Sequence, residues 1–187
     1  MFWQIREQTV ESQDKTLQLL DQYTPSDALE AEAHAFIRNF VTQQPRYWAR
    51  DTLEGHLTAS AWITNKDQSK AVLLHHKKLD IWVQPGGHVD DEDKTLAQAS
   101  MREAMEETGL TDLAFHQYGI FDLDVHAIPE RKNEPKHWHL DVRFWLVANN
   151  ETLNINEESN DLKWLSREEI EVLTQEESVL RMVRKTL

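Results

Sequence analysis

Cysteine is absent from this chain of 187 residues. A disulfide framework, a zinc site built from thiolates and a cysteine nucleophile are therefore excluded. Basic residues are also scarce, with 20 Lys and Arg against 33 Asp and Glu and a formal net charge of −13. Proteins that bind a phosphate backbone gather Lys and Arg on one face. We therefore expect no nucleic-acid partner, and a polyanionic substrate would need a cation as intermediary.

Long hydrophobic runs are missing as well. No stretch of the sequence approaches the roughly 20 apolar residues that a membrane helix needs. The N-terminal residues MFWQIREQTV lack both the basic and the apolar region of a signal peptide. We expect no membrane association and a cytoplasmic location. The residues that are present, 40% hydrophobic and 28% charged, are typical of one folded domain of ordinary size.

Helical periodicity dominates the N-terminal part of the chain. From about Val10 to Val41 apolar residues recur at helical spacing, and the turn TPSD at 24–27 interrupts them. The pattern predicts two helices, with Ser26 or Asp27 as the cap of the second. We expect residues 1–50 to form a helical extension packed on the main domain, residues 51–187.

Strand signals dominate the rest of the sequence. Residues 56–64, HLTASAWIT, alternate apolar and polar side chains, which is the rhythm of a strand. Further strands are predicted at 71–76, 79–84, 115–128, 137–149 and 161–165, and a helix at 176–187. Strands on both sides of a central helix, with more helices at each end, indicate an α/β sandwich with a mixed sheet.

The central helix and one later helix carry recognisable end signals. A helix is predicted over 94–108, with Asp93 as its N-cap and Gly109 as the left-handed residue that ends it. Ser166 and Glu169 have the spacing of a capping box, which predicts the start of another helix.

Three glutamates gather on one face of the central helix. At about 100° per residue, Glu103, Glu106 and Glu107 share a face. The expected core-facing stripe is formed by Ala97, Met101, Ala104 and Met105. Like charges at these spacings repel one another. The face is therefore either a solvated acidic surface or the grip of a hard divalent cation, for which Mg²⁺ fits best.

Two adjacent glycines precede this helix. Gly86 and Gly87 follow a predicted strand, in a turn where the backbone must bend and approach another group closely. The stretch GGHVDDEDKTLAQASMREAMEETGL resembles the Nudix box. That pattern is Gly, five residues, Glu, seven residues, then Arg-Glu-aliphatic-any-Glu-Glu-any-Gly-aliphatic. The matching residues are Gly87, Arg102, Glu103, Glu106, Glu107, Gly109 and Leu110.

The loop before the helix departs from the family pattern. Fourteen residues separate Gly87 from Arg102, one more than the pattern has. The family's first glutamate corresponds to Asp93 when counted from Gly87 and to Lys94 when counted from Arg102. Neither residue is Glu, so the chain departs from the family pattern at that position. Ala104 also stands where a larger aliphatic residue is usual.

The resemblance implies a Nudix-like α/β/α sandwich that hydrolyses a nucleoside diphosphate linked to another group, X. It implies that Glu103, Glu106, Glu107 and the carbonyl of Gly87 bind Mg²⁺ or Mn²⁺. Arg102 would orient a glutamate, and Glu106 or Glu107 would be the general base. The N-terminal extension would cover the sheet, lengthen the pocket or form a homodimer interface, and the sequence leaves these alternatives open.

Two alternative functions share the resemblance. A non-catalytic Nudix-like module that binds a nucleotide commonly loses the box glutamates, whereas all three on this helix are present. A prenyl diphosphate isomerase uses a cysteine in protonation, and this chain has none.

A second polar constellation lies downstream of the box. Asp122, Asp124 and His126 share one face of a predicted strand, and a hairpin would set them beside the next strand. The next strand contributes His137, His139, Asp141 and Arg143. The combined surface is either the wet outer face of a sheet or one wall of the active site.

As a wall of the active site, this surface would bind substrate. His126, His137 and His139 would contact phosphate in preference to a transition metal. Asp141 and Arg143 would complete the surface. His88, directly after the glycine pair, is one more candidate for a phosphate contact.

Overall fold

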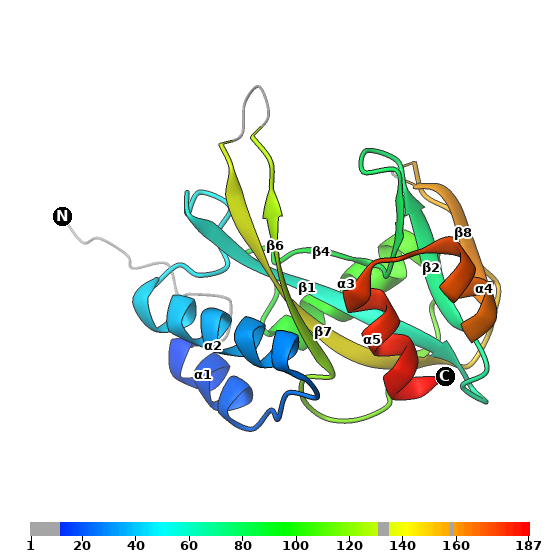
Figure 1. The fold of residues 1–187 in the computed structure, drawn as a ribbon, viewed down its shortest axis with the longest axis horizontal. Coiled ribbons are helices and arrows are strands. Elements are labelled where there is room, and N and C mark those ends of the chain that lie inside the picture. The colour runs from blue at the N-terminus through cyan, green and yellow to red at the C-terminus, as the bar shows by residue number, and fades with distance from the viewer. Residues whose placement is uncertain (1–11, 131–134, 158) are drawn as a thin grey trace.

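The computed structural model describes residues 12–130, 135–157 and 159–187, and within them a mixed sheet of eight strands forms the centre of the fold (Figure 1). The strands are β1 (Gly55–Asn65), β2 (Ala71–His76), β3 (Ile81–Val83), β4 (Gly86–His88), β5 (Leu113–Phe115), β6 (Asp122–Ile128), β7 (His137–Ala148) and β8 (Ser159–Leu165). Their order is β3-β2-β1-β7-β5, with β4 paired to β1, β6 to β7 and β8 to β2. Strands β1 and β7 run parallel, and the other pairs are antiparallel. The expected mixed sheet is confirmed.

Helices cover both faces of the sheet (Figure 1). They are α1 (Gln13–Asp21), α2 (Ala28–Gln43), α3 (Leu96–Thr108), α4 (Arg167–Leu173) and α5 (Glu177–Thr186). On β1, Ala61 and Ile63 pack in one apolar cluster with Ala104 of α3. Trp62 lies on the opposite face and packs with Met182 of α5. The alternation of side chains along one strand therefore supports a helix layer on each side.

The N-terminal helices belong to the same hydrophobic core as the sheet. Ile37 and Phe40 of α2 cluster with Leu57 of β1, Leu140 of β7 and Leu96 of α3. The boundary at residue 50 between the helical extension and the main domain stays a prediction. The homodimer interface suggested for the extension also stays a prediction. Among the described helices, none is both long enough and apolar enough to cross a membrane.

Three predicted helix ends are confirmed. The side chain of Asp27 accepts a hydrogen bond from the Glu30 N–H at 2.8 Å and caps α2. Gly109 ends α3 with φ 70°, in the left-handed region that glycine tolerates. Ser166 and Glu169 form the expected capping box at the start of α4.

The predicted start of α3 was wrong. Its N-cap is Thr95, whose side chain accepts a hydrogen bond from the Gln98 N–H at 3.0 Å. Asp93 lies before this cap and pairs with Arg102 instead. The predicted core stripe was also wrong at Met105, which is 40% exposed.

Several strand boundaries differ from the prediction. Of the segment predicted as one strand over 115–128, Asp122–Ile128 forms β6 and Phe115 is the last residue of β5, whereas residues 116–121 form no strand. The predicted strand 79–84 shrinks to β3. The two glycines expected in a turn lie in β4, which pairs with β1. Val10 and residues 131–134 lie outside the described residues.

Candidate active site

Glu103 packs directly against the backbone of Gly87. A Cβ atom at position 87 would lie 2.6 Å from the Cδ and from both carboxylate oxygens of Glu103. Gly87 pairs with Ala59 of β1, and Ala59 packs with Leu96 at the start of α3. The strand pairing thus places a glycine, which has no Cβ, at the position where any side chain would overlap the Glu103 carboxylate.

Glu107 contacts the other glycine of the pair. The Gly86 N–H donates to its Oε2 at 2.8 Å, and the residue is 8% exposed. Glu106 lies nearer to solvent, with 59% of its side chain exposed. The structure therefore brings two of the three predicted metal ligands against β4 and leaves the third at the rim.

Arg102 is the positive charge among these carboxylates. Its guanidinium donates to Glu103 Oε1 at 2.8 Å and to Glu106 Oε2 at 3.3 Å. The same group donates twice to Asp93, at 2.8 and 3.2 Å. These bonds, with Asp93 first, raise the pKa of Arg102. The acidic face of α3 is stabilised because the Arg102 guanidinium binds glutamates of the helix and also Asp93 of the preceding loop.

Asp93 occupies the ambiguous position of the box. Its side chain is 4% exposed and points to Arg102, whereas Lys94 is exposed. The extra loop residue therefore directs Asp93 toward the site. Its carboxylate accepts hydrogen bonds from Arg102 and from the Asp90 N–H at 2.9 Å, and the contact with the arginine orients that side chain.

The electrostatics suit a divalent cation. Burial raises the pKa of the Glu103 carboxyl, although Arg102 acts in the opposite direction. A second positive charge beside Glu103 would therefore stabilise its ionised form. Carboxylate oxygens of Glu103, Glu106 and Glu107, with a nearby backbone carbonyl, are the hard donors that Mg²⁺ and Mn²⁺ take. The residues present fit the metal that the box implies.

The hairpin of β6 and β7 brings the downstream constellation together as predicted. Asp122 pairs with Arg143, Asp124 with Asp141, and His126 with His139. A wet outer surface does not describe this face. Asp122 is 0% exposed, and Asp141 and Arg143 are each 2% exposed.

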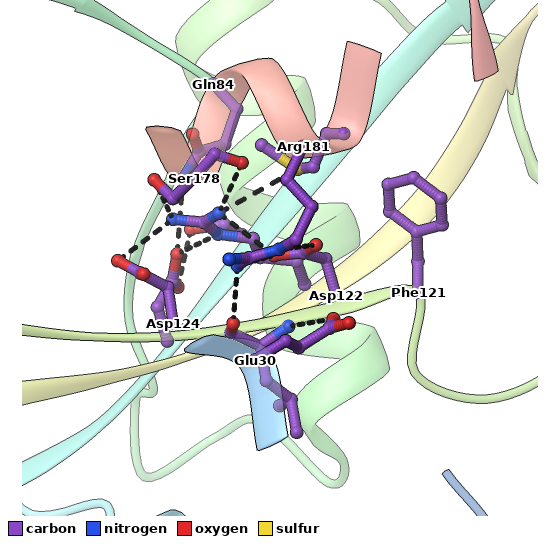
Figure 2. A network of polar contacts seen from close by, with 12 residues as sticks. Glu30, Gln84, Phe121, Asp122, Asp124, Ser178 and Arg181 are labelled. Carbon is purple, nitrogen blue, oxygen red and sulfur yellow. Dashed lines mark hydrogen bonds and ion pairs between the residues drawn. The ribbon is translucent and has the colours of Figure 1, made fainter. Parts of the chain in front are cut away.

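Arg143 belongs to a buried network of polar contacts with Asp122 and Asp124, which Figure 2 shows together with Arg181. It donates to Asp141 at 2.7 Å and to Asp122 at 3.1 Å, and it pairs with Asp124 at 3.4 Å. Arg181 of α5 holds both oxygens of Asp122 at 2.8 Å. These contacts connect α5 to the sheet, and the predicted substrate contact of Arg143 stays a prediction.

Asp141 connects the same network to β1. It accepts hydrogen bonds from Thr58 at 2.9 Å, Ser60 at 2.7 Å and Gln84 at 3.2 Å. With Arg143 as a further donor, both of its oxygens have partners within the protein. Its predicted role in substrate binding is likewise untested.

Histidines from β1, β4, β6 and β7 meet on this face of the sheet. The ring of His56 on β1 has its centroid 4.9 Å from His88, 5.1 Å from His137 and 5.0 Å from His139. His126 lies 5.5 Å from His139 and is the outermost member. The predicted substrate-binding histidines are therefore neighbours, although no structural contact tests their role.

His56 was not predicted from the sequence to belong to this group of histidines. It was read only as a polar position in an alternating strand, and it becomes part of the cluster because β1 pairs with β7, placing it directly opposite His139. Its one signal in the sequence is that it stands two residues before Thr58, on the polar face of the strand.

Burial lowers the pKa of two histidines in this cluster. It lowers the pKa of His88 to about 3 and the pKa of His139 to about 2. The neighbouring imidazoles lower both values further, and Arg50 adds to the effect on His88. Both rings are therefore neutral near pH 7.

Comparison with known proteins adds to this geometry. The model of the NUDIX domain family matches residues 55–185. A probable DHNTP pyrophosphohydrolase of Lactococcus lactis is 36% identical over 92 residues, which cover 48% of this chain and 52% of that protein. The chain thus aligns with about half the length of that curated relative.

Solved structures share the fold. The binary complex of an Ap4A hydrolase from C. elegans has a TM-score of 0.55 at 22% identity, covering 69% of this chain and 93% of that one. A NUDIX-family hydrolase from Clostridium perfringens has a TM-score of 0.53 at 24% identity, covering 69% and 94%.

Proposed function

Because this chain belongs to the Nudix family, we propose that it hydrolyses a pyrophosphate bond in a nucleoside diphosphate linked to another group, X. The observation that carries the proposal is that the Glu103 carboxylate lies against the backbone of Gly87, in the space that a Cβ at position 87 would fill. A carboxylate held there, beside Glu107 and with Arg102 behind it, is an arrangement suited to a divalent cation.

The metal-binding residues in this proposal are Glu103, Glu106, Glu107 and the carbonyl of Gly87, and the ion is Mg²⁺ or Mn²⁺. A bound ion of this kind neutralises pyrophosphate oxygens and lowers the pKa of water. Arg102 holds Glu103 in place through its 2.8 Å hydrogen bond, and the Gly86 N–H does the same for Glu107.

Glu106 or Glu107 is the proposed general base. Either carboxylate would take a proton from the water that attacks phosphorus, as the bond from that phosphorus to the leaving phosphate breaks. Glu107 is the more rigid of the two because Gly86 fixes one of its oxygens. Glu106 is the more exposed and reaches Arg102 at 3.3 Å.

The histidine surface is the proposed wall for the rest of the substrate. His88 directly follows Gly87, so the surface begins where the metal-binding residues end. His126, His137 and His139 continue it along β6 and β7. Asp141 and Arg143 lie behind the wall and fix β7 to β1 and α5.

A substrate panel tests the proposal and identifies X. DHNTP and Ap4A, the compounds in the names of the two relatives, belong in it with ADP-ribose, nucleotide sugars and nucleoside triphosphates. We expect product release from at least one compound with Mg²⁺ or Mn²⁺ and none in the presence of a chelator. Glu103→Gln, Glu106→Gln and Glu107→Gln should each lower kcat.

The matched control is Glu32→Gln, an exposed glutamate on α2. It removes the same charge from a helix surface and should leave turnover unchanged. Turnover that survives chelation, or that survives Glu103→Gln and Glu107→Gln together, would contradict the mechanism. Binding of a nucleotide without hydrolysis would instead identify a non-catalytic module.

A further inference from the structure

The three histidines His56, His88 and His139 form a compact group of nitrogen donors. One ring nitrogen from each can be chosen so that all three lie within 4.8 Å of one another. The ring centroids are 4.9 Å apart for His56 and His88, 5.0 Å for His56 and His139, and 5.1 Å for His88 and His139. Small changes of rotamer would bring these nitrogens around a single ion.

Strand register, rather than a flexible loop, holds this geometry. His56 lies opposite His139 in the parallel pair of β1 and β7. His88 lies opposite Thr58 in the antiparallel pair of β1 and β4. Side chains at paired or alternate positions share a face, so three strands present three imidazoles to one point. Ligands on strands of one sheet are more rigidly placed than ligands on loops.

The chemistry of the group favours a cation over an anion. His56 is 2% exposed, and His88 and His139 are partly buried. Three imidazoles whose nitrogens converge on one point, with one ring fully buried, are a donor set typical of a metal site. A neutral imidazole offers a lone pair, which is the form that binds a metal.

We propose that His56, His88 and His139 bind a divalent transition-metal ion of the zinc class, separate from the ion of the Nudix box. Imidazole nitrogens suit Zn²⁺ and Co²⁺, whereas the carboxylates of the box suit Mg²⁺ and Mn²⁺. Three protein ligands also match the number found in zinc sites that keep one position for water or substrate.

The two sites share strand β4. The His88 carbonyl accepts a hydrogen bond from Arg102 at 2.9 Å, and Gly87 precedes it in the chain. An ion on the histidines would therefore add positive charge beside the box in a chain of net charge −13. The proposal does not depend on the hydrolytic function, because the histidine donors are present whatever the box does.

Cobalt absorption tests the site directly. The full chain, without a histidine tag and freed of metal by a chelator, is titrated with Co²⁺. We expect one equivalent to produce the visible absorption of a low-coordinate nitrogen site, and Zn²⁺ to abolish it by displacement. His139→Gln and His56→Gln should weaken Co²⁺ binding by more than the roughly 10–100-fold that loss of an outer-shell partner causes.

Two control variants distinguish binding at these histidines from binding at a different histidine or at the Nudix box. His75→Gln removes a histidine of β2 that pairs with Asp80, and it should leave the Co²⁺ signal intact. Glu103→Gln combined with Glu107→Gln should abolish Mg²⁺-dependent turnover and retain the Co²⁺ signal. Circular dichroism of each metal-free variant confirms folding, and His88→Gln serves if another variant does not fold.

Three outcomes would overturn the proposal. The first is a wild-type chain that shows no low-coordinate Co²⁺ absorption at micromolar concentrations. The second is an equal loss of signal in His75→Gln and His139→Gln. The third is a signal that disappears with the two box glutamates and persists in folded His139→Gln and His88→Gln. The readout is spectroscopic, so failure of the hydrolytic proposal would leave it unaffected.

Discussion

Arg102 donates to the backbone carbonyl of His88 at 2.9 Å through the same guanidinium that holds Glu103 at 2.8 Å. One side chain on α3 thus fixes a carboxylate of the box and the strand that carries His88. The planar fork of arginine suits such divided contacts, whereas a lysine ammonium acts as a point charge. The position of Arg102 therefore matters for orientation as much as for charge.

Replacing Arg102 by Lys should lower kcat by about 10–100-fold, the range seen when outer-shell partners of metal ligands are lost. The charge remains, but Asp93, Glu103 and the His88 carbonyl lose a shared donor. Steady-state kinetics with Mg²⁺ measure the change. Arg38→Lys, at an exposed pair with Asp21, should leave kcat within about twofold. An unchanged kcat in Arg102→Lys would show that charge alone is sufficient.

Gly87→Ala should displace the Glu103 carboxylate. The new Cβ would lie 2.6 Å from three of its atoms, which real contacts do not allow. Because the metal ligand moves, we expect weaker Mg²⁺ activation and a lower kcat in a chain that remains folded. Mg²⁺ titration of the activity gives the shift. Gly119→Ala controls for the loss of a glycine as such: its Cβ would meet no atom within 4 Å, but its φ of 99° strains any side chain, so it should lower stability and leave Mg²⁺ activation unchanged.

Substitutions at Asp93 and Thr95 should have different effects, the first on turnover and the second on the free energy of unfolding. Asp93→Asn weakens the pair with Arg102 at 2.8 Å and should reduce turnover. Thr95→Ala removes the N-cap of α3 and should cost about 1 kcal/mol of unfolding free energy with little change in turnover. Kinetics and urea unfolding on both variants test this. If Asp93 were the cap, as the sequence suggested, Thr95→Ala would leave the free energy of unfolding unchanged, which would contradict this assignment.

Local signals explain which features could be predicted. The glycine end of α3 and the capping box of α4 depend on residues a few positions apart, and both were found. The placement of the polar faces of β6 and β7 side by side followed from two neighbouring strands and the connection between them. The Nudix box, which matches at Arg102 and the three glutamates, gave the family.

Distant pairings explain what was missed. His56 joins His139 only through the parallel ladder of β1 and β7, and that pairing leaves no local trace in the sequence. The sequence also carried no sign that Arg143 shares Asp122 with Arg181, because Arg181 comes from the last helix. The burial of a polar strand face depends on which helix covers it, and strand alternation does not specify that.

Glu30 should make the fold sensitive to acid. It is 0% exposed and accepts hydrogen bonds from Lys185 at 2.7 Å and from the Ser26 N–H at 2.6 Å. Burial alone would raise its pKa, but these bonds and one from Tyr23 outweigh it and lower the pKa from 4.5 to about 2. The folded state therefore gains stability above pH 4.5 and loses it as the pH falls toward 2.

At neutral pH the lowered pKa of Glu30 contributes on the order of 3 kcal/mol to the free energy of unfolding. In urea unfolding, the free energy of unfolding of the wild type should decline between about pH 7 and pH 3. Glu30→Gln should be less stable than the wild type at pH 7 and should show a smaller decline. Burial would raise the pKa of Asp124, but its hydrogen bond with His126 and the charge of Arg143 lower it to about 2. This carboxyl is present in the wild type and in Glu30→Gln, so it adds to the decline of both proteins. Glu32→Gln, an exposed glutamate on the same helix, should keep the wild-type slope. Equal slopes for Glu30→Gln and Glu32→Gln would mean that the contacts of Glu30 with α5 do not control acid stability.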